Sequence, residues 1–183
     1  KLVSNRILMG EIKKYIKENL IIGVLSTLPD AENALFEELQ KLYGEADLIT
    51  DPLNFKWTSY YDKEMGDSIR RRFLSFKRLI DPSELSLIKH ATNDIEQKYV
   101  VGEGRKINLD PGLLDLNRLI LATTKNVGHR IPLQDGIYGE VTLIYMKKEF
   151  HALDWTYPDY QSPEYISILE KIRSLYKEKL KQK

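Results

Sequence analysis

Apolar and polar residues follow two different patterns in the first part of the chain. Residues 20–26 form a short apolar run rich in Ile and Val, which predicts a buried strand in the middle of a sheet. From Asp30 the apolar residues recur with a helical period, so we expect an amphipathic helix that Asp30 caps and Gly44 ends. The predicted buried side of this helix holds Leu35, Leu39 and Leu42, with Phe36 and Tyr43 beside them.

The next stretch predicts strands followed by a second helix. Residues 46–57 alternate loosely around Pro52, which is typical of a bent or edge strand. Arg70-Arg71-Arg72 begins a further strand that turns Arg71 away from its two neighbours, which favours a solvated strand face over an anion site. Asp81-Pro82-Ser83-Glu84 is typical of a helix start. That helix would end near Gly102, bury Leu85, Ile88, Ile95 and Tyr99, and carry His90 on its surface.

The later elements are shorter. Residues 106–109 predict a strand that turns at Pro111-Gly112, where Asp110 would order the turn through a side-chain hydrogen bond. Residues 116–124 suit either a helix or a strand, and the neighbouring hairpin favours a strand. Residues 150–153 predict a short strand and residues 155–160 an aromatic loop. Ser162-Pro163-Glu164 then begins a last helix with one apolar stripe formed by Tyr165, Leu169, Ile172 and Tyr176.

A β-hairpin is predicted between Gly128 and Tyr145, because two alternating runs flank Asp135-Gly136, a dipeptide suited to a type I′ turn. A two-residue turn would pair Leu133 with Tyr138, Ile131 with Glu140 and His129 with Thr142. It would place His129, Glu140 and Thr142 on the less apolar side, and Val141, Leu143 and Tyr145 on the other.

The element order over residues 20–110 predicts an α+β fold, with a ferredoxin-like unit and a mainly antiparallel sheet. The hairpin would extend this sheet and the C-terminal helix would cover it. We expect an N-terminal lead over residues 1–17 and a single α+β domain over residues 18–183. Met9-Gly10-Glu11 resembles a natural start, so we expect residues 1–8 to come from an upstream start or from outside the natural chain.

Composition excludes several classes of protein. Lys and Arg total 28 against 27 for Asp and Glu, a balance that gives no argument for nucleic acid or an anionic membrane as partner. The chain has no Cys, which excludes a disulfide framework, thiol catalysis and Cys-ligated zinc. It has no secretory signal pattern and no apolar run of about 18 residues, so we expect a soluble cytoplasmic protein.

Common nucleotide and hydrolase motifs are missing. No Gly-Lys dipeptide occurs, so there is no P-loop, and Gly102-Glu103-Gly104 lacks the third glycine of a dinucleotide fingerprint. The three His residues are scattered without a His-Glu-x-x-His pattern, and no Gly-x-Ser-x-Gly elbow is present. The sequence therefore predicts no particular cofactor.

The candidate site residues gather mainly between residues 108 and 160. His129 with Asp110 or Glu140 suits general acid–base chemistry, or a divalent metal held by one imidazole and oxygens. The competing interpretation is a His129–Glu140 cross-strand pair on a solvated face. The predicted catalytic residues are His129, Asp110 and Glu140. The predicted ligand-binding residues are Asn108, Arg130, Trp155, Tyr157, Asp159, Tyr60 and Tyr61, although Tyr60 and Tyr61 also suit simple packing of a ring on the domain.

Several segments resemble one family from Leu20 onward. They include Tyr60-Tyr61-x-x-Glu64-Met65-Gly66, Asn108-Leu109-Asp110-Pro111-Gly112, His129-Arg130-Ile131, Gly136-Ile137-Tyr138-Gly139-Glu140 and Trp155-Thr156-Tyr157-Pro158-Asp159-Tyr160. The chain is similar to the bacterial domain of unknown function 4416 family. The resemblance implies no activity, and no catalytic residue is carried over from it. Pro132 departs from similar chains, which tend to have a large residue there, so we expect the first hairpin strand at an edge.

Two functional hypotheses follow. The first is a domain that binds, or acts on, a small anionic or nucleotide-like ligand at a pocket formed by segments 108–112, 129–140 and 155–160. The alternative is a non-enzymatic interaction module that contacts RNA or a protein partner through the sheet face, the arginine run and exposed aromatic residues.

Overall fold

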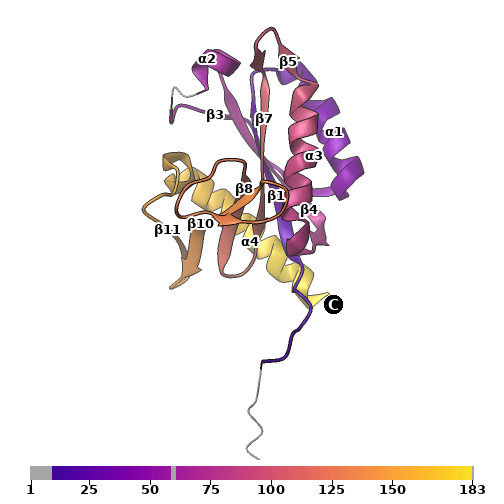
Figure 1. The fold of residues 1–183 in the computed structure, drawn as a ribbon, viewed down its shortest axis with the longest axis vertical. Coiled ribbons are helices and arrows are strands. Elements are labelled where there is room, and N and C mark those ends of the chain that lie inside the picture. Colours follow the sequence, from indigo (N-terminus) through magenta and orange to yellow (C-terminus); the bar gives the residue numbers. More distant parts are fainter. Residues whose placement is uncertain (1–9, 59–60, 183) are drawn as a thin grey trace, which may run out of the picture.

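The computed structural model describes residues 10–58 and 61–182 and has an α+β fold (Figure 1). Within these residues nine strands form one antiparallel sheet in the order β11-β10-β8-β7-β1-β4-β2, with β3 paired to β4 and β9 to β10. The strands are β1 (Glu18–Ser26), β2 (Ala46–Ile49), β3 (Leu53–Asn54), β4 (Arg70–Ile80), β7 (Ile107–Leu114), β8 (Arg118–Thr123), β9 (Ile131–Pro132), β10 (Tyr138–Met146) and β11 (Glu149–Ala152). A small separate hairpin joins β5 (Val100–Val101) and β6 (Gly104–Arg105).

Helices cover both faces of the sheet. Their bounds are α1 (Glu32–Tyr43), α2 (Asp62–Met65), α3 (Leu85–Gln97) and α4 (Pro163–Lys181), and the 3₁₀ turns are η1 (Pro29–Ala31), η2 (Pro82–Glu84) and η3 (Pro158–Gln161). Apolar residues of α1 and α3 pack with one set of strand residues, including Leu20, Ile22 and Leu74. Apolar residues of α4 pack on the opposite face with another set, including Ile21, Phe73 and Leu114. The alternation of residues 20–22 and 73–74 between these two clusters is the two-residue period of a strand buried on both sides.

Elements with strong local signals form as predicted. β1 lies in the middle of the sheet, between β7 and β4. The Asp81 carboxylate accepts a hydrogen bond from the Ser83 N–H at 3.0 Å, which caps the turn η2 that leads into α3. The Ser162 hydroxyl accepts a hydrogen bond from the Tyr165 N–H at 3.2 Å at the start of α4, whose predicted stripe is buried. Residues 118–123 form a strand, and His90 is exposed.

The boundaries of the first two helices differ from the prediction. Asp30 lies inside η1, and no side chain caps α1. Leu42 is 46% exposed, because the buried arc of α1 centres between Leu39 and Tyr43 and leaves Leu42 at its edge. α3 ends at Gln97, before the β5–β6 hairpin.

The hairpin forms, but its predicted pairing is wrong by one residue. Asp135 and Gly136 have φ angles of 55° and 77°, as a type I′ turn requires. Tyr138 faces Pro132 rather than Leu133, because Leu133 and Gln134 together oppose Ile137, as in a β-bulge. The competing interpretation of a His129–Glu140 pair on a solvated face is wrong for Glu140, which is buried, as is Thr142.

The predicted turn at Pro111-Gly112 is wrong, because β7 runs straight through both residues. Only residues 112–114 pair with residues 119–121 of β8, which we call the paired half of the β7–β8 junction. Over residues 107–111 the two strands part, and residues 122–123 of β8 pair with β10 alone; this is the split half.

Side chains replace the missing strand partner in the split half. The Leu109 N–H donates to the Glu96 carboxylate at 2.7 Å, and the Leu109 carbonyl accepts from Lys89 Nζ at 2.8 Å. Pro111 lies two residues further along, so its ring nitrogen faces the same side as the Leu109 N–H. A proline is therefore accommodated within the strand, because no backbone acceptor of β8 lies opposite it.

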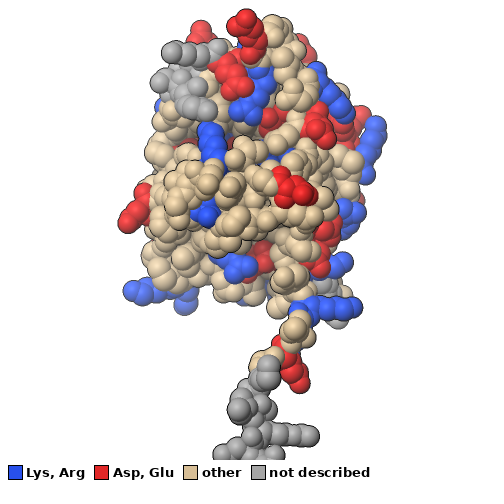
Figure 2. Space-filling view, viewed as in Figure 1, with Lys and Arg blue, Asp and Glu red and all other residues tan. Residues whose placement is uncertain are grey.

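The remaining predictions on overall organisation have different outcomes. β9 pairs with β10 alone among the described strands, which places Pro132 at an edge. The ferredoxin-like assignment, the domain limits and the origin of residues 1–8, which lie outside the described residues, stay predictions. No helix in the described ranges is long and apolar enough to cross a membrane. On the face shown in Figure 2, acidic and basic side chains are intermixed.

Candidate functional site

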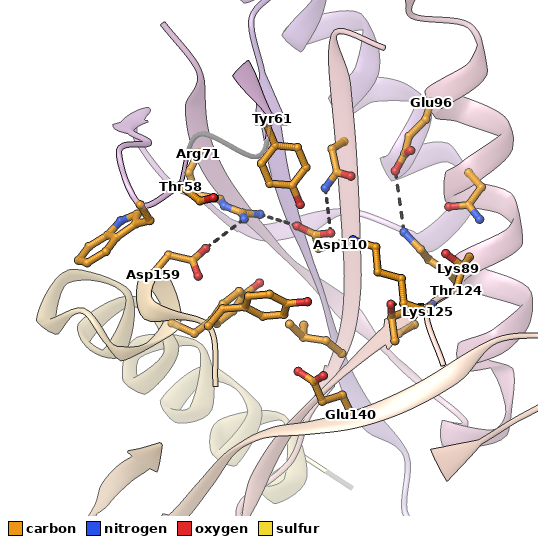
Figure 3. A pocket seen from close by; sticks show the side chains of 18 of the residues that line it. Thr58, Tyr61, Arg71, Lys89, Glu96, Asp110, Thr124, Lys125, Glu140 and Asp159 are labelled. Carbon is orange, nitrogen blue, oxygen red and sulfur yellow. Dashed lines mark hydrogen bonds and ion pairs between the residues drawn. The ribbon is translucent and has the colours of Figure 1, made fainter. Parts of the chain in front are cut away.

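A pocket of about 650 Å³ opens above the split half (Figure 3). β4, β7, β8 and β10 contribute residues to it from the sheet, α3 from one side and the segment around η3 from the other. The loop between β3 and α2 supplies further lining residues. The charged lining residues are Arg71, Lys89, Arg105, Lys125, Arg130, Glu96, Asp110, Glu140 and Asp159. Because the strands part here, side chains from segments far apart in sequence meet at one cavity.

Arg71 is the central buried charge of the pocket. Its Nη1 donates to Asp110 Oδ2 at 2.8 Å, and its Nη2 donates to Asp159 Oδ2 at 3.3 Å. Only 3% of the Arg71 side chain is exposed, and its guanidinium carbon lies within 6 Å of the Phe55, Phe73 and Tyr160 ring centres. The sequence-based interpretation of Arg71 as part of a solvated strand face is therefore wrong.

Gly23 leaves the space that Arg71 occupies. Arg71 lies on β4 and Asp110 on β7, so the side chain must pass over β1, which runs between them. Gly23 faces Phe73 on one side and Asp110 on the other. A Cβ atom at Gly23 would lie 2.7 Å from Arg71 Nη1, closer than such atoms approach in proteins. A residue with a side chain at this position would push the guanidinium out of place.

The two carboxylates that share Arg71 differ in acidity. Burial raises the pKa of Asp110, but the charges of Arg71 and Lys89 and the hydrogen bonds from Arg71 and Asn108 together outweigh it, so the net pKa lies below the usual value. The Asn108 amide donates to Asp110 Oδ1 at 2.8 Å and also stabilises the ionised form. Burial raises the pKa of Asp159, and the charge of Arg71 does not fully reverse the effect. The pKa values of these two neighbouring carboxyl groups are thus shifted in opposite directions.

Glu140 forms a second buried ion pair on the far side of the cavity. Its Oε2 accepts from Arg130 Nε at 2.6 Å and lies 2.9 Å from His129 Nε2. Arg130 also donates to the Tyr157 hydroxyl and to the Lys125 carbonyl, each at 3.0 Å. The His129 ring stacks on Trp155 with ring centres 4.8 Å apart and planes 8° apart. The Trp155 indole N–H in turn donates to the Val141 carbonyl at 2.8 Å.

Glu96 and its partners form the α3 side of the pocket. Its Oε2 accepts from Arg105 Nη1 at 2.5 Å, and its Oε1 lies 3.9 Å from Lys89 Nζ. Burial raises the pKa of Glu96, while Lys89 and the Leu109 N–H lower it, and the net direction is upward. Each of the four acidic side chains of the pocket therefore has a cationic partner.

Aromatic residues line much of the remaining surface: Phe55, Trp57, Tyr61, Tyr157 and Tyr160. Figure 3 shows the Tyr61 ring pointing toward Asp110. Burial and the negative charge of Asp110 raise the pKa of the Tyr61 hydroxyl, so it stays protonated at neutral pH. The pocket thus combines flat apolar surfaces with charged groups that are held in place by ion pairs.

The structure places seven of the predicted residues in the lining: Asn108, Asp110, Arg130, Glu140, Tyr157, Asp159 and Tyr61. His129 and Trp155 do not line the cavity but stack together beside Glu140. Asp110 does not order a turn; it lies in β7 and pairs with Arg71. Tyr60 lies outside the described residues.

Sequence reasoning missed Lys89, Glu96, Arg105 and Lys125, and it misplaced Arg71. A signal existed for Arg71 alone: it occupies a strand position two residues before Phe73, so it shares the buried side of Phe73. Within the described ranges no group of three His, Asp or Glu residues could hold a metal ion. A His129 metal site therefore has no support among these residues.

A family model described as "Domain of unknown function (DUF4416)" matches residues 16–176. The chain belongs to this family. The DUF4416 match spans the sheet and most of α4, and it includes every residue that lines the pocket. No curated protein and no solved structure matches the chain.

Proposed function

We propose that this DUF4416 protein binds a small anionic ligand of about nucleotide size in the pocket above the split half. The pocket itself carries the proposal. Its volume of about 650 Å³ lies within the range of small-molecule sites. Polar groups from four strands, α3 and the η3 segment converge on it.

The charge balance of the lining favours an anion. Five cationic side chains line the cavity, namely Arg71, Lys89, Arg105, Lys125 and Arg130, against the four acids Glu96, Asp110, Glu140 and Asp159. Each acid lies within 4 Å of one of these cations, so the carboxylates are compensated inside the protein. Lys125 adds a positive charge from the exposed loop after β8. An anionic ligand would meet a cavity whose lining carries a net positive charge.

The aromatic walls favour a ligand with a planar part. Tyr61, Tyr157 and Trp57 present ring surfaces to the cavity mouth and wall, where a flat heterocycle would gain contact area. If the bound ligand reacts, Asp110, whose pKa is lowered, would serve as the base and Asp159, whose pKa is raised, as the acid. His129, which does not line the cavity, would act only through Glu140.

The alternative, an interaction module for RNA or a protein partner, stays a prediction. It relied on the sheet face, the arginine run and exposed aromatic residues. Helices pack on both faces of the sheet, and Arg70 and Arg72 both bind the Glu32 carboxylate, at 2.7 and 3.1 Å. The pocket therefore supports ligand binding more strongly than the sheet faces or the arginine run support binding of RNA or a protein.

A thermal-shift screen of nucleotides, phosphorylated metabolites and dicarboxylates tests the proposal. The wild type is compared with Lys125→Ala, which removes an exposed lysine of the pocket, and with Lys171→Ala, which removes an exposed lysine of α4 as a matched control. A ligand at about 100 times its Kd stabilises the folded state by about 2.7 kcal/mol. For a protein of this length that corresponds to a rise in Tm of roughly 5–10 °C.

We expect Lys125→Ala to weaken the binding of the active anion about tenfold, the effect of one charge-assisted contact. Lys171→Ala should bind like the wild type. If no anion in the screen raises Tm, or if both lysine variants lose the shift equally, the pocket is not an anion site.

A further inference from the structure

One oxygen of Glu140 is left without a partner inside the pocket wall. Both contacts of this carboxylate, from Arg130 Nε and His129 Nε2, are made by Oε2. Oε1 is buried and has no hydrogen-bond partner within the described part of the chain. Only 2% of Glu140 is exposed, yet the residue lines the cavity, and Figure 3 shows its carboxyl group turned toward that space.

The surroundings of Glu140 hold this oxygen in place. All three nitrogens of the Arg130 guanidinium are engaged, with Glu140, the Lys125 carbonyl and the Tyr157 hydroxyl, so Arg130 cannot turn to serve Oε1 as well. His129 is fixed by its stack on Trp155. The result is a rigid hydrogen-bond acceptor in the wall of the cavity, and a buried acceptor that is left unpaired lowers stability.

We infer that Glu140 Oε1 accepts a hydrogen bond from an amino group of the ligand, so that the ligand is an anion that also carries an N–H donor. The inference rests on the proposed function, because it assigns a second recognition point to the same cavity. A ligand acceptor at this place would face a carboxylate oxygen and be repelled. An N–H donor would supply the hydrogen bond that the protein leaves unmade.

Glu140→Gln replaces the hydrogen-bond acceptor at this position with a donor and changes the shape of the side chain little. The Arg130 Nε–H needs an acceptor, so the amide oxygen of the glutamine takes the place of Oε2. Its NH₂ group then takes the place of Oε1 and presents a donor to the cavity. Glu170→Gln, an exposed residue of α4, is the matched control for loss of one carboxylate.

In each of two pairs of probes, methyl groups in one member replace the N–H donors of the other. Phosphoethanolamine carries an ammonium group where phosphocholine carries a quaternary amine, and AMP carries an amino group where N6,N6-dimethyl-AMP carries none. Binding is measured by isothermal titration calorimetry at 25 °C. We expect the donor member of at least one pair to bind the wild type about tenfold more tightly, the effect of one hydrogen bond to a charged group. Glu140→Gln should lose this preference and Glu170→Gln should keep it.

The outcomes separate this inference from the proposed function. Equal binding of both members of each pair to the wild type overturns the role of Glu140 while leaving an anion site in place. A preference that persists in Glu140→Gln also overturns it. If no probe binds the wild type, both the anion site and the inference fail. The wild-type comparison uses no variant, so equal binding of both members of each pair overturns the inference even if Glu140→Gln does not fold.

Discussion

The two halves of the β7–β8 junction pair the buried backbone groups of β7 in different ways. In the paired half, residues 112–114 satisfy their backbone groups with β8, and Leu114 and Leu119 pack into the apolar cluster beneath α4. In the split half, Leu109 finds its donor and acceptor in Lys89 and Glu96 of α3. Buried backbone groups must be paired in either case, so two charged side chains permit the sheet to open.

This difference explains why the pocket is lined by charges. A carboxylate and an ammonium group that replace a strand bring their own charge into the interior, and each needs a counter-ion there. Glu96 takes Arg105 as its partner. Across the sheet, Arg71 joins Asp110 and Asp159 where a closed sheet would bring apolar residues together. The parting of β7 and β8 and the polar lining of the cavity thus have the same structural cause.

The largest effect on stability is expected from adding a methyl group where β7 and β8 lie close together in the paired half. A Cβ atom at Gly112 would lie 2.6 Å from the Ile120 carbonyl oxygen, which belongs to the backbone and cannot move aside alone. Gly112→Ala should therefore destabilise the protein by about 3 kcal/mol, the upper range for overpacking. Chemical denaturation followed by circular dichroism measures this change.

Gly139→Ala is the control, because it adds a methyl group to a buried strand glycine where the nearest atoms would lie at an ordinary 3.5 Å. It should change stability by less than about 1 kcal/mol. Equal losses in the two variants would mean that the paired half is not closely packed at Gly112.

The split half should respond to pH through Asp110, with a smaller effect. The folded-state pKa of Asp110 is lowered, because the charges of Arg71 and Lys89 and the hydrogen bonds to the carboxylate together outweigh burial. The unfolded chain therefore binds a proton at a higher pH than the folded chain does. Its contribution to stability is fully present above the unfolded pKa of about 3.9 and is lost as pH falls through the lower folded value.

Asp110→Asn should accordingly cost about 2 kcal/mol at pH 7, the effect of losing a charged hydrogen-bond partner of a buried Arg71, and the cost should shrink as the pH falls below about 4. Urea denaturation at a series of pH values tests this. Asp154→Asn, at an exposed aspartate, is the control for the loss of one negative charge. If the difference in stability between the wild type and Asp110→Asn stays constant with pH, the Arg71–Asp110 ion pair is not its cause.

Local signals predicted much of the fold and a fair part of the site. The cap at Asp81, the Ser162 helix start and the buried stripe of α4 depend on residues close in sequence, so one segment contains all the information. Arg71 depends on Asp110 and Asp159, 39 and 88 residues away, and on the small size of Gly23 on the strand between. Pairings between distant strands have no local signature, so the ion pairs of Arg71 and the gap that accommodates Pro111 emerge only from the folded sheet.

Pro111 gives the smallest expected effect and the sharpest contrast between the two interpretations of segment 108–112. If this proline shaped a turn, its replacement would release the backbone and cost stability on the scale of a lost turn. In the structure it lies within β7, with its ring nitrogen toward the split where β8 offers no backbone acceptor. Pro111→Ala should then cost only about 0.5 kcal/mol, the gain in freedom of the unfolded chain. Chemical denaturation measures the change, and a hydrogen-exchange profile of residues 107–114 that matches the wild type would confirm that the strand persists. A loss above about 2 kcal/mol, or rapid exchange at Leu109, would show that the proline itself holds the two strands apart.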